Sequence, residues 1–177
     1  MVAAVVITSF VVNRHYPLSV LSGEKSVGTW VSVFLLSAST AFAFVIMMKK
    51  GFFPWMPVIL FLFTLAIDER FMFHESLKEM IIFSQRPHLS PHSLWGELPV
   101  ILAGIVGGGI VLLIWKNIQR GNRLFILLAM CFGGLSVLLD VTNRLLIVED
   151  LAKICGELFL AICFLREVGS AQYSRSN

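Results

Sequence analysis

Charged residues are scarce in this sequence. Only 14% of its residues are Asp, Glu, Lys or Arg, whereas 57% are hydrophobic. A soluble domain is typically about a quarter charged and less than half apolar, and a compact soluble fold of the present composition would have too few polar side chains to cover its surface. The composition therefore excludes a soluble globular enzyme and a disordered chain, and it predicts an integral membrane protein.

Several motifs of familiar chemistry are also missing. The three cysteines lie in apolar stretches without a CxxC pattern, which excludes a disulfide scaffold and argues against a cysteine metal site. No P-loop, GxSxG or HExxH motif occurs, and His74 is the one histidine near an apolar segment, so neither a nucleotide nor a haem is expected. The sequence contains no cluster of four or more basic residues, and we therefore expect neither nucleic acid as a partner nor a strong lipid-headgroup site.

Long apolar runs dominate what is present. A membrane-spanning helix needs about 20 apolar residues to cross roughly 30 Å of hydrocarbon. Five segments are predicted to do so: residues 27–48, 52–73, 98–115, 124–147 and 148–168. Residues 2–16 form a shorter apolar stretch that is either a sixth span, which we favour slightly, or a helix in the membrane interface. The sequence thus predicts one domain over residues 1–177, an all-α polytopic bundle of five or six transmembrane helices in contact with the lipid bilayer.

The distribution of charge predicts the orientation of this bundle. The loops after residues 48 and 115 contain basic residues and no acid: Lys49, Lys50, Lys116, Arg120 and Arg123. By the positive-inside rule these loops, and with them the C-terminus, are cytoplasmic. All of the 11 acidic residues except Glu167, and all four histidines, lie toward the opposite face. We expect a bacterial inner membrane, with the acidic and histidine-bearing face periplasmic or extracellular.

Ionisable residues of three predicted helices are expected at one depth in the membrane. At a rise of about 1.5 Å per residue, Asp68 and Asp140 both lie roughly 25 Å from the cytoplasmic ends of their helices. Lys153, counted from the outer surface, lies at a similar level, and Glu157 lies one turn deeper. Charges at such a depth face the bundle interior or a water-filled cavity and need partners. The pattern therefore predicts a polar pocket in the outer third of the membrane.

Three interpretations of this pocket remain open. In the first, a divalent metal (Zn, Mn or Fe) is bound by imidazole and carboxylate ligands, namely His74 with Glu75, Asp68, Asp140 and Glu157. In the second, Arg70, Arg144 and Lys153 neutralise Asp68, Asp140 and Glu157 in a salt-bridge network that fixes helix packing. In the third, the acids line a proton or ion path, although the apolar cytoplasmic half of each helix counts against an alternating-access transporter.

These interpretations lead to three hypotheses about function. The first is a small membrane protein that binds a divalent metal or small ligand in the polar pocket, with metal-dependent hydrolysis as one use of the site. The second is a non-catalytic accessory or structural subunit of a larger membrane complex, and the third is a small ion or proton channel. Gly104 and Gly108, in a GxxxG pattern, predict close helix packing inside the bundle or across a homo-oligomer interface. Whether the protein is an enzyme stays open at this point.

Overall fold

The structure, a computed structural model, describes residues 27–51, 53–73, 76–77, 80, 98–142 and 146–173. All regular secondary structure within these residues is helical, which confirms the all-α part of the predicted fold class. The predicted segment 2–16 lies outside the described residues. The elements are α2 (Val27–Lys50), α3 (Met56–Phe71), α5 (Leu98–Ile114), the short 3-10 helices η1 (Trp115–Asn117) and η2 (Arg120–Asn122), α6 (Arg123–Thr142) and α7 (Leu146–Tyr173).

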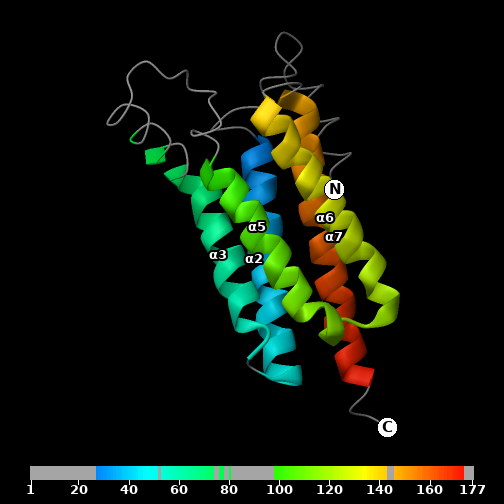
Figure 1. Cartoon of the computed structure of the whole chain (residues 1–177). Coiled ribbons are helices and arrows are strands. Elements are labelled where there is room, and N and C mark those ends of the chain that lie inside the picture. Colours follow the sequence, from blue (N-terminus) through cyan, green and yellow to red (C-terminus); the bar gives the residue numbers. More distant parts are fainter. Residues whose placement is uncertain are drawn as a thin grey trace.

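The α-helices lie side by side and run up and down along a common direction (Figure 1). α7 packs extensively against both α6 and α2, and α2 also packs against α3. α5 contacts α6 and, to a smaller extent, α3. We call the lower end in Figure 1, where α2 and α7 finish, the Lys50 end, and the opposite end, where α3 finishes, the Glu69 end.

Three of the described helices are long and apolar enough to cross a membrane: Val27–Lys50, Leu98–Asn117 and Arg120–Asp140. α3 is shorter, with 16 residues, and α7 carries charged side chains along its 28 residues. Large apolar side chains on α5 and α6, such as Ile105 and Leu138, are exposed on the outside of the bundle. Extensive exposed apolar surface fits contact with lipid, in keeping with an integral membrane protein.

The turn between α2 and α3 follows from local sequence. α2 ends at Lys50, and Gly51 takes a φ of 115°, which glycine adopts without steric cost. The Gly51 N–H donates to the carbonyl oxygen of Met47 at 3.0 Å. Pro57 lies in the first turn of α3, where its missing N–H is tolerated. The helix therefore begins at Met56, later than the start of the predicted span at residue 52.

The boundary between α6 and α7 also differs from the predicted spans. α6 ends at Thr142 and α7 begins at Leu146, whereas the apolar pattern placed the boundary after residue 147. Residues 143–145, between the two helices, lie outside the described residues.

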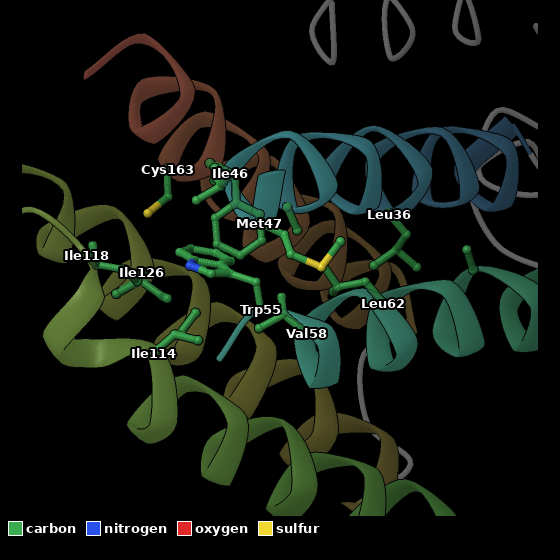
Figure 2. Close-up of a cluster of buried hydrophobic side chains, with 13 residues drawn as sticks. Leu36, Ile46, Met47, Trp55, Val58, Leu62, Ile114, Ile118, Ile126 and Cys163 are labelled. Carbon is green, nitrogen blue, oxygen red and sulfur yellow. The ribbon is translucent and has the colours of Figure 1, made fainter. Parts of the chain in front are cut away.

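The largest buried cluster of apolar side chains lies toward the Lys50 end and is centred on Trp55 (Figure 2). Trp55 is fully buried and meets Phe164 of α7 edge to face, with ring centroids 5.5 Å apart. Around it lie side chains from α2, α3, the α5–α6 connection and α7, including Ile46, Val58, Ile118 and Cys163. Truncation of such a buried aromatic residue to alanine costs about 3–5 kcal/mol, so this cluster is a main source of cohesion between the helices.

Glycine permits the closest approach between helices at Gly156 of α7. A Cβ added there would lie 3.1 Å from the backbone nitrogen of Gly133 on α6. Similarly, a Cβ added at Gly107 of α5 would lie 3.0 Å from the ring of Phe61 on α3. For the two glycines of the GxxxG pattern, a Cβ on Gly104 would meet Val137 at 3.9 Å, and within the described residues a Cβ on Gly108 would meet nothing within 4 Å. The predicted packing role of these two glycines stays a prediction.

Candidate functional site

A polar layer connects α2, α3 and α7 toward the Glu69 end. Lys153 of α7 forms an ion pair with Glu69 of α3, in which the ammonium group donates to Oε2 of the carboxylate. One turn further along α7, Oε1 of Glu157 accepts a hydrogen bond of 2.6 Å from the Ser32 hydroxyl of α2. Asp150, one turn before Lys153, interacts electrostatically with both Lys153 and Glu69. We call these five residues the Glu69 layer.

Helical periodicity explains why these side chains meet. Lys153 and Glu157 are four residues apart and therefore lie on one face of α7. Ser32 belongs to the buried stripe along α2, so its hydroxyl is directed into the bundle. Glu69 follows Ala66, a buried residue of α3, by about one helical turn and continues the inward face of that helix. The three helices thus each direct polar groups inward at this level.

The Glu69 layer contains more acid than base. Glu69, Asp150 and Glu157 supply carboxylates, whereas Lys153 supplies the one ammonium group, and Lys153 interacts with all of these acids. Oε2 of Glu157 is buried, and no hydrogen-bond donor reaches it from the described part of the chain. A buried charge without a partner is costly. This oxygen is therefore the point in the layer where a proton or a bound cation would be stabilised most.

Of the predicted site residues, Lys153 and Glu157 lie together in the Glu69 layer. Glu69, which was not among the predicted site residues, forms the ion pair with Lys153. Asp68 is half-buried on α3, and Asp140 is half-buried near the end of α6. Each of these two aspartates has an interaction partner of its own.

The remaining predicted site residues are Arg70, which the structure describes, and three residues outside the described part of the chain. Arg70 is exposed, and its guanidinium lies 4.8 Å from the ring centroid of Trp30 on α2 in a cation–π contact. His74, Glu75 and Arg144 lie outside the described residues. Within the described residues, no group of three His, Cys, Asp or Glu side chains is arranged to hold a metal ion. The predicted metal-ligand set therefore stays a prediction.

A partly open pocket of about 410 Å³ lies beside the part of α3 toward the Glu69 end. Its lining consists mainly of apolar side chains of α3, with Ala103 contributed by α5, and Asp68 is the charged residue among them. Ligand pockets commonly combine an apolar lining with a few polar groups that fix orientation.

A second polar group, which was not predicted from the sequence, lies at the Lys50 end. Glu167 of α7 is fully buried. Its Oε2 pairs with the Lys50 ammonium of α2 at 2.5 Å. Its Oε1 accepts hydrogen bonds from the backbone N–H of Gln119 at 2.7 Å and from the side-chain amide of Asn122 at 2.8 Å. We call Lys50, Gln119, Asn122 and Glu167 the Glu167 cluster.

Asn122 joins the Glu167 cluster to the rest of α7. Its side chain is buried, and its Oδ1 accepts a hydrogen bond of 3.0 Å from Nε of Arg166. Lys50 also donates to the carbonyl oxygen of Asn117 in the connection between α5 and α6, at 3.3 Å. Both carboxylate oxygens of Glu167 are thus occupied, and the cluster fastens the end of α2 and the α5–α6 connection to α7. Such a saturated arrangement serves stability and leaves no free position for a ligand.

One signal in the sequence pointed to this cluster. Glu167 is the lone acid near the basic loops that follow residues 48 and 115, and an acid within an apolar helix needs a cation nearby. The identity of that cation could not be derived, because Lys50 and Glu167 are 117 residues apart in the chain.

The chain matches a family model described as "Domain of unknown function (DUF8692)" over residues 1–167, and it belongs to that family. No curated protein and no solved structure is significantly similar to the chain. The family match includes the Glu69 layer and extends to Glu167, so both polar groups belong to the family domain.

Proposed function

We propose that this protein is a small polytopic membrane protein that binds a cation in the Glu69 layer, a divalent metal such as Zn, Mn or Fe in the first instance. The observation that supports this proposal is the charge balance of the layer. Glu69, Asp150 and Glu157 surround the single ammonium of Lys153, and Oε2 of Glu157 is buried without a donor among the described residues. An exchangeable cation would supply the missing positive charge.

The proposed ligands combine residues of the layer with those predicted from the sequence. Glu157 is the central oxygen donor, and Asp68, Asp140, His74 and Glu75 complete the proposed set. Imidazole and carboxylate groups are ligands that suit zinc, manganese and iron. A metal that keeps an open position activates water, which would allow hydrolysis of a substrate reaching this face of the membrane.

The proposal includes five or six transmembrane helices, with α3 and α7 among them. The polar contacts of Lys153, Glu157 and Glu167 run to neighbouring helices or to the α5–α6 connection. These charges are therefore shielded from lipid, as intramembrane charges must be. The basic residues at the Lys50 end support a cytoplasmic location of that end. The Glu69 layer then lies toward the periplasmic or extracellular side of a bacterial inner membrane.

A second candidate function is that of a non-catalytic subunit in a larger membrane complex. The exposed apolar surface of α5 favours this candidate. Only 6% of the most apolar stretch of α5 is buried inside the bundle, whereas 44% of the corresponding stretch of α2 is buried. A partner protein would cover this surface as well as lipid does. To test this candidate, the protein is purified in mild detergent and any proteins that co-purify with it in stoichiometric amounts are identified.

The decisive experiment for the cation site measures bound transition metal in the purified protein by mass spectrometry. We expect about one ion per chain in the wild type, and loss of the ion in Glu157→Gln and His74→Ala. Ser32→Ala, which removes the hydroxyl that orients Glu157, should weaken metal binding about tenfold. Ser39→Ala is the matched control, because this buried hydroxyl lies on the same helix and has no hydrogen-bond partner among the described residues.

The variants also separate binding from stability. A thermal unfolding curve for each protein shows whether the loss of metal accompanies a loss of fold. Metal that is lost in Glu157→Gln but retained in Ser39→Ala, with both proteins folded, supports the proposal. A wild-type protein that takes up none of the metals after incubation with them contradicts it and leaves the layer as a salt-bridge network.

A further inference from the structure

The fold gathers basic residues that are dispersed in the sequence. The end of α2, the connection between α5 and α6, and the last turns of α7 meet at the Lys50 end. They bring six cationic residues to this end: Lys49, Lys50, Lys116, Arg120, Arg123 and Arg166. Glu167 is the one acid at this end within the described residues, and it is buried against Lys50. We call the five cationic residues other than Lys50 the basic rim: Lys49, Lys116, Arg120, Arg123 and Arg166.

The basic rim is not neutralised by the described part of the chain. Lys116 and Arg120 are exposed. Lys49 donates to the carbonyl oxygen of Val168 at 3.3 Å, and Arg166 donates to Asn122. Both of these acceptors are uncharged. The positive charge of the rim is therefore available to an external anion.

Aromatic rings hold two of the rim guanidinium groups in place. Arg123 lies over Trp115, with its guanidinium carbon 5.3 Å from the ring centroid. Arg166 lies over Phe125 in the same way, at 4.9 Å. Guanidinium groups held by cation–π contacts lose less freedom when they bind an anion. Such groups are well suited to the planar, bidentate recognition of phosphate.

Exposed apolar side chains border the basic rim. Met48 is 68% exposed, Phe53 in the α2–α3 turn is 84% exposed, and Leu124 next to Arg123 is 62% exposed. A soluble anion or a nucleic acid would leave these side chains in water, whereas a phospholipid offers a phosphate to the cations and acyl chains to the apolar groups. This succession of apolar and basic side chains is the one expected at the boundary between hydrocarbon and headgroups.

We propose that the basic rim binds the headgroups of anionic phospholipids in the adjacent leaflet. This inference does not depend on the cation site at the other end of the bundle. The sequence predicted no strong headgroup site because the six cations occur in short groups that only the fold brings together. Each cation near an anionic surface changes lipid affinity by about fivefold, so a rim of several cations should distinguish anionic from zwitterionic lipid clearly.

The test compares two lipids that differ only in headgroup charge. The full-length protein in a nonionic detergent is titrated with phosphatidylglycerol and with phosphatidylcholine of identical acyl chains, and bound lipid is counted by native mass spectrometry. The double variant Lys116→Gln/Arg120→Gln removes two exposed charges and should weaken phosphatidylglycerol binding about 25-fold. Arg70→Gln, which removes an exposed charge at the Glu69 end, is the control and should leave lipid binding unchanged.

The outcomes separate lipid from other anions. Preference for phosphatidylglycerol that is lost in the double variant and kept in Arg70→Gln supports the proposal, provided that the lipid-free unfolding temperature of the double variant matches the wild type. Equal binding of the two lipids, or an equal loss in Arg70→Gln, overturns it. Displacement of phosphatidylglycerol by inorganic phosphate at the same concentration also overturns it, because the rim would then be a site for a soluble anion.

Discussion

Removal of the Lys50 ammonium should destabilise the bundle strongly. In Lys50→Met the apolar stem of the side chain is largely kept and the charge is lost. The Glu167 carboxylate would then keep only two uncharged donors, the N–H of Gln119 at 2.7 Å and the amide of Asn122 at 2.8 Å. Because Glu167 is fully buried, water cannot replace the missing cation without opening the cluster.

The expected magnitude follows from the environment of the pair. Loss of one partner from a buried ion pair costs about 3–5 kcal/mol. The Lys50 side chain is itself 26% exposed, so water screens part of the interaction and the cost should be near the lower limit, about 3 kcal/mol. Lys49→Met is the matched control. Its ammonium donates to the Val168 carbonyl oxygen at 3.3 Å, and loss of one such hydrogen bond costs about 1 kcal/mol or less.

The double variant Lys50→Met/Glu167→Gln isolates the charge interaction. The Gln carbonyl oxygen can still accept hydrogen bonds from Gln119 and Asn122, and no uncompensated charge remains. The double variant should therefore be more stable than Lys50→Met alone, with a coupling energy of about 2 kcal/mol. Reversible unfolding in mixed micelles of nonionic detergent and dodecyl sulfate, followed by tryptophan fluorescence and far-ultraviolet circular dichroism, provides the measurement. Agreement of the two probes justifies a two-state analysis.

Two results would refute this reasoning. If Lys50→Met is no more destabilising than Lys49→Met, the Glu167 carboxylate does not depend on the ion pair for its stability. If the double variant is as unstable as the sum of its single variants, Lys50 and Glu167 act independently. Either result would mean that the Glu167 cluster does not stabilise the packing of α2 against α7.

Two further predictions concern helix packing and topology. Gly156→Ala should destabilise the protein by about 1–3 kcal/mol, because the new Cβ would lie 3.1 Å from the backbone nitrogen of Gly133. Gly134→Ala is the control and should be neutral or stabilising, because a Cβ there meets nothing within 4 Å among the described residues. Equal effects of the two variants in the same unfolding assay would contradict the close α6–α7 contact. Reporter fusions after Lys50 and after Arg123 should both give the cytoplasmic signal, and a signal from the other side at either position would reverse the proposed orientation.

Apolar runs were sufficient to predict the helical architecture. The runs 27–48 and 98–115 coincide with α2 and with α5 and η1, because a long apolar run has few alternatives to a helix in a membrane. The helix ends followed less directly from the apolar runs. α3 begins at Met56 with Pro57 in its first turn, and the residues between Thr142 and Leu146 lie outside the described part of the chain.

Side-chain pairing was harder to predict than helix position. Adjacent residues on a helix point about 100° apart, so the choice between Asp68 and Glu69 as the partner of Lys153 depends on how α3 is rotated about its axis. That rotation is set by packing, including the contact of Gly107 with Phe61, which no periodicity in α3 alone reveals. Depth along the membrane normal could be estimated from residue counts, whereas rotation could not.

Glu157 and Glu167 offer a comparison within one helix. They are ten residues apart on α7, roughly 15 Å along its axis, and both accept hydrogen bonds from other helices or the α5–α6 connection. Glu167 has a cation and two further donors for its two oxygens. Glu157 has the Ser32 hydroxyl for one oxygen and, among the described residues, no donor for the other. The same fold thus satisfies one buried carboxylate completely and the other only in part. If packing were the sole role of Glu157, a glutamine would serve it at lower electrostatic cost, and the unmet requirement at its second oxygen is the one that the proposed cation would satisfy.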